Sequence, residues 1–346
     1  MLGNKIVNAL VLGSLALAVP ALARAESEDD QLIEFQYRVQ VPAIKASDLP
    51  VQIMVPLPPS NDQQSIISRS IDLKPDLARN QIEIRKESSY GNEFWAWTID
   101  KPQTLPTTVT FRYKVLRRFH SVGPWQKAEK LDYKVGETAP FQQFLKADER
   151  VPIDGELILK LKQEIPKSAV TPVQKAKAIY DYVVDNMEYK KVGTGWGNGD
   201  TYWACSQKYG NCTDFHALVT SMARAEGIPA KFAIGFPIPE GKSEGEIAGY
   251  HCWLELYLPQ LAWMPLDASE AKKNLKKREF FFGHHPADRI LFSVGRDLRL
   301  PGMKDRPLNF FIYPYVEKEG KASKDFVKTE FTFRLLKQEP MKASND

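Results

Sequence analysis

The segment Tyr209–Ala230 reads YGNCTDFHALVTSMARAEGIPA, and it decides the expected fold of the chain. Its apolar residues recur at the spacing of one helix face, which predicts an amphipathic helix that begins at Cys212. These apolar residues are Phe215, Leu218, Val219 and Met222. Gly227 and Pro229 mark the end of this predicted helix.

The two residues before the predicted helix suit a sharp bend. Gly210 and Asn211 are the residue types most at ease in tight-turn or left-handed backbone, so the chain can present Cys212 at the bend. A thiol at a helix start lies close to free N–H groups, and the helix dipole favours its thiolate. Cys212 is therefore a candidate nucleophile, although a single cysteine is more often a small buried apolar residue.

A second segment, Tyr250–Asp267, reads YHCWLELYLPQLAWMPLD and predicts an antiparallel hairpin. A turn centred on Pro259 places His251 directly opposite Asp267, within reach of an imidazole–carboxylate hydrogen bond. Such a bond would fix the ring tautomer and leave the other ring nitrogen facing a thiol. Pro265 removes one donor of the strand ladder, which predicts an edge strand or a bulge.

Together these segments resemble the transglutaminase-like superfamily of papain-related folds, over roughly residues 146–292. The likeness is carried by GNCTDF, RAEGIPAKFAIGF, GYHCW and WMPLDASEA, which stand in the family's order and spacing. In particular they resemble bacterial secreted transglutaminase-like proteins, which are described as candidate cysteine proteases. The resemblance implies a triad in which Cys212 is the nucleophile, His251 the general base and acid, and Asp267 the orienting carboxylate.

Such a triad implies acyl transfer through a thioester on Cys212. We expect hydrolysis of amide bonds, as in a peptidase or amidase, rather than transamidation, because water is the default acceptor. The backbone N–H of Cys212 is the expected first oxyanion donor, and Gln207, Trp203 and Tyr189 are unranked candidates for the second. No cofactor or metal is expected. The alternative class is a non-catalytic cell-envelope binding or assembly protein that retains this fold.

Residues 1–25 predict a cleaved signal peptide, with Lys5, an apolar run and a small-x-small ending at Ala23-Arg24-Ala25. The apolar run is short for a retained membrane anchor. Cleavage removes Lys5 and Arg24, the only charged residues of this segment, and lowers the net charge from +4 to +2. That balance gives no support for nucleic-acid binding. We expect a periplasmic or secreted protein without stable membrane insertion, acting on a peptide or protein amide of the cell envelope.

Three cysteines are an odd number for an exported protein. We expect Cys205 and Cys252 to be free buried thiols, and a Cys205–Cys252 disulfide is the alternative. Cys212 and His216 stand four residues apart on one helix face, but a zinc site is disfavoured because no C-x-x-C pair is present. His216 is instead expected to be a satisfied, partly buried histidine beside the site. Asp214 is expected to stabilise the first turn of the helix.

The length of 346 residues predicts two domains after the leader. Six or seven short alternating strands over residues 26–120 predict an all-β immunoglobulin-like sandwich. Residues 121–150 read as a linker, 151–300 as the α+β, papain-like transglutaminase-core domain, and 301–346 as a C-terminal strand extension. A fragment that begins near Lys146 would then hold the whole triad.

Overall fold

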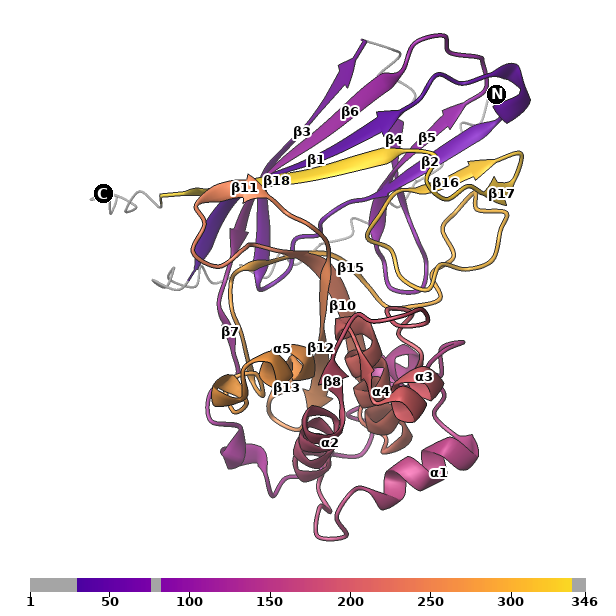
Figure 1. The fold of residues 1–346 in the computed structure, drawn as a ribbon. Coiled ribbons are helices and arrows are strands. Elements are labelled where there is room, and N and C mark those ends of the chain that lie inside the picture. Colours follow the sequence, from indigo (N-terminus) through magenta and orange to yellow (C-terminus); the bar gives the residue numbers. More distant parts are fainter. Residues whose placement is uncertain (1–29, 76–81, 338–346) are drawn as a thin grey trace, which may run out of the picture.

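The computed structural model of the chain describes residues 30–75 and 82–337 (Figure 1). These residues form two lobes, a β-sandwich and a mixed lobe in which helices surround a four-stranded sheet. The predicted signal peptide, residues 1–25, lies outside the described residues. Within the described ranges, no helix has both the length and the apolar character needed to cross a bilayer.

The sandwich consists of two antiparallel five-stranded sheets. The first has the order β11 (Glu244–Glu246), β18 (Lys328–Leu336), β1 (Gln31–Val41), β6 (Thr107–Arg117) and β3 (Gln64–Lys74). The second has the order β17 (Lys321–Ala322), β16 (Tyr315–Lys318), β2 (Val51–Pro56), β5 (Glu93–Ile99) and β4 (Ile82–Lys86). Alternating apolar residues of β1, β2, β5 and β6 fill the space between the sheets, as the period-two pattern of the sequence predicts.

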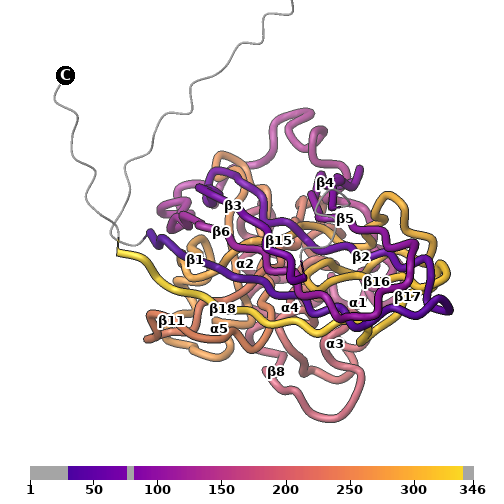
Figure 2. The backbone as a smooth tube through the Cα atoms, turned by 90° about the horizontal axis from the view of Figure 1, so that it is seen from above, coloured from indigo at the N-terminus to yellow at the C-terminus, as the bar shows by residue number. Residues whose placement is uncertain are grey.

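Strands from later parts of the chain complete both sheets. β18 lies beside β1, with Phe333 opposite Phe35, and Figure 2 shows the two running together along the molecule. β16 pairs with β2, and β11, which precedes the His251 strand, pairs with β18. The sandwich therefore uses residues from the expected catalytic range 151–300 and from the expected extension 301–346, not only residues 26–120.

The second lobe is built on the sheet β13 (Ala262–Leu266), β12 (His251–Leu258), β10 (Ala230–Pro237) and β15 (Arg289–Val294), in that order. Its helices are α1 (Gly155–Gln163), α2 (Pro172–Asn186), α3 (Thr201–Gln207), α4 (Cys212–Ala225) and α5 (Ala268–Lys273). Two small strand pairs join β7 (His120–Ser121) to β14 (His284–His285) and β8 (Glu188–Tyr189) to β9 (Tyr209–Gly210).

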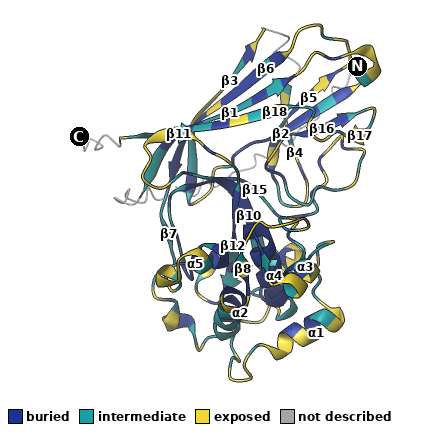
Figure 3. Cartoon of the chain, viewed as in Figure 1, coloured by how far each residue is buried: buried dark blue, intermediate teal, exposed yellow. Residues whose placement is uncertain are grey.

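Helix α4 begins at Cys212, as the sequence predicts, but it is not a half-exposed amphipathic helix. Every residue from Cys212 to Arg224 is buried, because the other four α-helices and strands β10 and β12 surround it (Figure 3). Its polar side chains are therefore inside the protein and must find partners there. Thr220 donates to the carbonyl of His216, for example, and Ser221 shares a hydrogen bond with Thr201.

The predicted hairpin is present, with a different register. Tyr257 lies opposite Trp263, so the turn is centred on Gln260 and not on Pro259. Gln260 adopts a left-handed φ of 59°, a conformation that the residue type does not predict. Asp267 consequently lies beyond strand β13 as the N-cap of α5, not opposite His251 on the ladder. β13 is an edge strand, as Pro265 predicted.

Residues 121–150 are packed against the second lobe and do not form a loose linker. They contain the 3-10 helices η3 (Trp125–Ala128) and η4 (Ala139–Leu145). Phe141 and Phe144 of η4 lie edge-on to Trp263, with ring centroids 5.2 and 5.0 Å apart. The Tyr133 hydroxyl donates to the carbonyl of Tyr257, at 2.5 Å. This segment therefore covers the back of the hairpin that carries His251.

Candidate active site

Asn211 caps helix α4 and fixes the position of Cys212. Its side-chain oxygen accepts the backbone N–H of Thr213 at 2.9 Å, and its own N–H donates to Asp214 at 3.0 Å. Neither Asn211 nor Gly210 has a left-handed backbone. Gly210 is needed for another reason: a Cβ there would lie 2.3 Å from the Asp214 carboxylate. The bend before Cys212 is therefore set by capping and by close approach.

Asp214 ties a glycine-rich loop to the start of α4. Its side chain is fully buried, and it accepts the backbone N–H groups of Gly197 at 2.7 Å and Gly199 at 3.0 Å. Burial raises the pKa of Asp214 more than these bonds lower it. The expected dipole role understates this residue, because a first-turn carboxylate could equally have faced solvent.

His251 and Asp267 form a buried hydrogen-bonded pair. His251 Nε2 lies 2.6 Å from Asp267 Oδ2, and the two residues are 4% and 1% exposed. The other oxygen of Asp267 accepts the backbone N–H of Glu270 at 2.9 Å and the Ser269 hydroxyl at 2.8 Å. His251 Nδ1 is thereby left for a different partner. The structure thus joins the two residues through a helix cap, although the expected strand register was wrong.

The thiol of Cys212 lies beside the His251 ring. The ionised forms of Cys212, His251 and Asp267 stabilise one another. Burial raises the pKa of Cys212, but the neighbouring Cys252 thiol and the hydrogen bond and charge of His251 bring it well below its ordinary value. Burial lowers the pKa of His251, while the charge and hydrogen bond of Asp267 raise it to a net value of about 9. Burial also raises the pKa of Asp267, yet the charge of His251, the nearby His216 and the hydrogen bond from His251 hold it well below its usual range. This balance favours a thiolate–imidazolium pair on a carboxylate.

All three cysteines are free thiols, and Cys205 is half-buried on α3, not buried. Cys252 is fully buried on the leucine face of β12, where its Sγ lies 3.3 Å from His216 Nδ1. His216 Nε2 lies 3.4 Å from Asp267 Oδ1. His216 is thus completely buried and lies against the same carboxylate as His251. The i, i+4 spacing of Cys212 and His216 was the only signal in the sequence for this arrangement.

The three expected oxyanion donors differ in their surroundings. Gln207 is exposed and its amide donates to the Ser206 hydroxyl, while the Trp203 indole N–H donates to the carbonyl of Tyr209. Burial raises the pKa of Tyr189, and the neighbouring charge of Cys212 raises it further, so its hydroxyl stays protonated beside the thiol. Of these three, Tyr189 is the one whose hydroxyl has no hydrogen-bond partner among the described residues and whose pKa is raised by the charge of Cys212.

The sequence analysis did not single out the tyrosines on the other side of the thiol. The Tyr250 hydroxyl accepts from Asn211 Nδ2 at 3.2 Å, and its backbone N–H bonds to the Tyr313 hydroxyl. Tyr313 lines two hollows of about 340 and 360 Å³, the first with Phe310 and the second with Phe331. Cys212 and His251 line neither hollow, and Tyr313, whose pKa burial and the charge of Cys212 raise, is the residue that links the hollows to the site.

One group of side chains in the described residues has the spacing of metal ligands. His251, Asp267 and Glu270 offer atoms within 4.8 Å of one another. However, the Nε2 atom of His251 already bonds to Asp267, and Lys273 pairs with Glu270. Arg289 Nη2 adds a second positive charge 3.6 Å from Glu270. These cations disfavour a divalent ion at this position.

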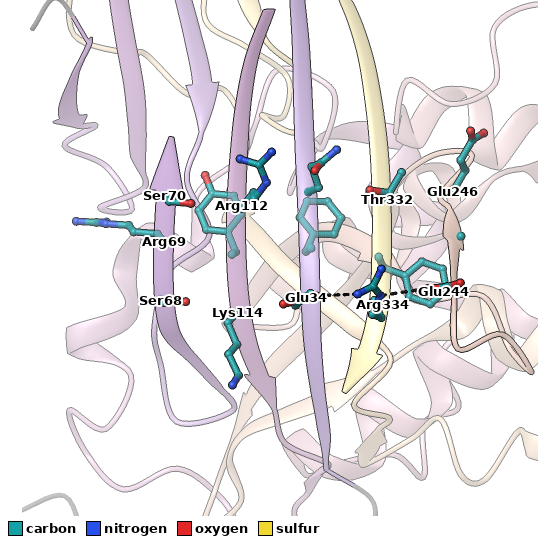
Figure 4. A pocket seen from close by; sticks show the side chains of 15 residues that line it. Glu34, Ser68, Arg69, Ser70, Arg112, Lys114, Glu244, Glu246, Thr332 and Arg334 are labelled. Carbon is teal, nitrogen blue, oxygen red and sulfur yellow. Dashed lines mark hydrogen bonds and ion pairs between the residues drawn. The ribbon is translucent and has the colours of Figure 1, made fainter. Parts of the chain in front are cut away.

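A larger hollow lies elsewhere, on the outer face of the first sandwich sheet. It measures about 740 Å³ and is lined by residues of β1, β3, β6, β11 and β18 (Figure 4). Cys212, His251 and Asp267 are not among its lining residues. Arg334 lies between Glu34 and Glu244, at 3.9 and 3.1 Å. Its mixed charges show no preference for an acidic or a basic ligand.

Residues 159–268 match the sequence profile described as Transglutaminase-like superfamily. This segment is a transglutaminase-like core domain. A protein of Haemophilus influenzae, named only as uncharacterized, is 24% identical over 357 residues, which cover 93% of this chain and 95% of that protein. The crystal structure of a "putative cysteine protease" from Cytophaga hutchinsonii has the same fold, with a TM-score of 0.59 and 16% identity over 89% of this chain and 92% of that chain. The likeness thus extends beyond the transglutaminase-like domain to nearly the whole chain.

Proposed function

We propose that the protein is an exported cysteine-nucleophile enzyme that acts on amide bonds through a thioester on Cys212. His251 serves as general base and acid, and Asp267 orients it. Hydrolysis, as by a peptidase or amidase, is favoured over transamidation. The substrate class is a peptide or protein amide of the cell envelope, and the compartment is the periplasm or the medium.

The main support for this proposal is the arrangement of Cys212, His251 and Asp267. A thiol at a helix start faces a histidine whose far nitrogen lies 2.6 Å from a buried carboxylate. Burying charged groups costs free energy unless they are paired, so a group of this kind has no evident value to a purely structural core. The shifts in pKa favour the ionised thiol, which is the nucleophilic form.

The steps of acyl transfer follow from the positions of these side chains. The Cys212 thiolate attacks the amide carbonyl, and the protonated His251 passes its Nδ1 proton to the leaving amine. The neutral ring then takes a proton from water, which attacks the thioester and releases the acid. Asp267 accepts from Nε2 throughout and stabilises the imidazolium each time it forms.

The oxyanion of each tetrahedral intermediate needs two donors. The backbone N–H of Cys212, at the first turn of α4, supplies one, since it has no partner within the helix. We assign the second to the Tyr189 hydroxyl, because Gln207 is exposed and Trp203 is occupied. The hollows that Tyr313 lines are the candidate positions for parts of the substrate beyond the scissile amide.

The direct experiment is to trap the acyl-enzyme. Mature protein is incubated with a panel of cell-envelope peptides and quenched in acid, and its intact mass is measured. A mass increase that maps to Cys212 and decays in water, with release of the acid, is the expected result. Cys205→Ser is the matched control and should acylate normally, while Cys212→Ser should not form a thioester.

The competing function is non-catalytic binding of a cell-envelope partner. It would be supported if the peptides bound to wild type and Cys212→Ser equally and no adduct or cleavage product appeared with any of them. Adducts that persist in water but are released when amines are added, with formation of a new amide, would point to transamidation.

A further inference from the structure

Two imidazole rings share the carboxylate of Asp267. His251 Nε2 is 2.6 Å from Oδ2, and His216 Nε2 is 3.4 Å from Oδ1. The far side of each ring faces a thiol: Cys212 for His251, and Cys252, at 3.3 Å, for His216. The site therefore contains two cysteine–histidine arms on one acid, of which the acyl-transfer steps above use only the first.

The second arm is inaccessible to a substrate. His216 and Cys252 are 0% exposed, and α4 and β12, which carry them, face each other in the core. Their role must therefore be exerted through their neighbours, and the neighbour they share with the catalytic arm is Asp267. Thiol and imidazole are polar groups that a core of leucine or valine would replace at no cost in hydrogen bonds.

The two contacts of His216 favour one tautomer. An ionised carboxylate only accepts, so the Nε2 atom that faces Asp267 Oδ1 at 3.4 Å is favourable there only when it carries a proton. Its Nδ1 is then an acceptor, and the Cys252 thiol is the donor that faces it. Burial and the neighbouring Cys212 raise the pKa of Cys252 well above its ordinary value, so that thiol keeps its proton.

We propose that His216 is a positioning residue, which holds Asp267 in place for His251, and that Cys252 holds His216 in the tautomer this requires. The inference rests on the function proposed above. Asp267 Oδ1 accepts from Ser269 and Glu270, both within the same turn of chain. His216 Nε2 approaches the same oxygen from α4, at 3.4 Å, and it is a buried nitrogen with no hydrogen-bond partner of its own among the described residues. Without His216, the carboxylate stabilises the His251 imidazolium less, and the Cys212 thiolate loses its counter-charge.

Two pairs of matched variants in the full mature chain test the proposal. His216→Gln can still direct an N–H to Asp267, whereas His216→Leu cannot. Cys252→Ser keeps a donor for His216, whereas Cys252→Ala does not. For each protein, the rate of Cys212 alkylation by iodoacetamide is measured against pH by mass spectrometry, together with kcat and KM on a reporter amide identified by acyl-enzyme trapping.

His216→Leu should lower kcat and the alkylation rate at pH 6.5 by roughly tenfold to a hundredfold, the scale of one lost polar contact with a charged group. Its alkylation midpoint should move to higher pH, while KM stays the same. Cys252→Ala should change both quantities in the same direction by a smaller factor. His216→Gln and Cys252→Ser should stay close to wild type, as should the control Cys205→Ser.

The proposal is overturned if folded His216→Leu has the wild-type pH profile, or if the Leu and Gln variants lose activity equally. If His216→Leu does not fold, the comparison of Cys252→Ala with Cys252→Ser decides the question in the same way. An unreactive Cys212 in wild type would contradict the proposed function itself, so the two failures are distinguishable.

Discussion

Phe35 of β1 stacks on Phe236 of β10, with ring centroids 5.3 Å apart. Phe292 of β15 extends this contact, since its ring centroid is 5.4 Å from that of Phe35 and 6.0 Å from that of Tyr37. These aromatic side chains join the sandwich to the sheet that carries His251. The lobes therefore share one apolar core instead of meeting at a polar interface.

A fragment that begins at Lys146 should not fold on its own, contrary to the expectation of a separable catalytic domain. It would leave Phe236 and Phe292 without their partners on β1, and large aromatic side chains contribute several kcal/mol each to a core. Circular dichroism should show no cooperative thermal transition for the fragment, with the mature chain as the control. A cooperative melt together with an alkylatable Cys212 would contradict this prediction.

Replacing Asp214 by alanine should lower the free energy of unfolding by about 2–4 kcal/mol, because backbone N–H groups at Gly197, Gly199 and Asn211 lose their acceptor. Urea denaturation provides the measurement. Asp72→Ala is the control, since its 3.8 Å contact with Arg112 is exposed and worth less than about 1 kcal/mol. Equal stability of the two variants would mean that Asp214 does not hold the loop.

Asp267→Asn should fold and yet lose about two to four orders of magnitude in turnover. The asparagine oxygen can keep the bonds from Ser269 and Glu270, but its amide nitrogen would face His251 Nε2 and disfavour the required tautomer. Turnover on a reporter amide and a thermal melt together give the answer. Unchanged turnover would show that Asp267 does not orient His251.

Acylation should also fail at alkaline pH. The folded-state pKa of His251 is raised to about 9, so its protonated form, the general acid, is present below that value and is lost as the pH rises through it. The single-turnover acylation rate of wild type should therefore fall near pH 9. In Asp267→Asn this fall in rate should occur at lower pH, since the carboxylate charge that raises the pKa of His251 is gone. If the fall stayed near pH 9 in the variant, His251 paired with Asp267 would not be the general acid.

Much of the site could be predicted because its information is local. The start of α4 at Cys212 follows from spacing and capping residues, and the hairpin follows from alternation and turn residues. The register could not be predicted, because glutamine is not a residue type that favours the left-handed φ of 59° found at Gln260. For the same reason Asp267 was expected on a strand, and it lies at a helix cap.

Long-range pairings escaped the sequence analysis altogether. The composition of β18 predicts a strand but does not say that it lies beside β1, about three hundred residues away. Likewise, the i, i+4 spacing places His216 below Cys212 but not against Cys252 and Asp267. The residues next to a histidine in an apolar helix pattern do not indicate which distant side chains it will contact.

Tyr189→Phe should lower kcat by about 10²- to 10³-fold with little change in KM, because a donor that meets the oxyanion acts in the transition state and not in substrate binding. Steady-state kinetics on the reporter amide measure both values. Tyr202→Phe is the control, since Tyr202 lies on α3 and is 58% exposed. If the two variants behave alike, the second oxyanion donor is another group.

The central claim is that Cys212 is an activated nucleophile, and the pH profile of its alkylation in the folded protein tests this most directly. Cys205 is half-buried while Cys212 is 2% exposed, so access alone favours labelling of Cys205. The account predicts the opposite order at pH 6.5, with Cys212 labelled first by iodoacetamide and Cys252 protected. Labelling of Cys212 only after unfolding, or only in step with an ordinary thiol as the pH is raised above 8, would contradict it.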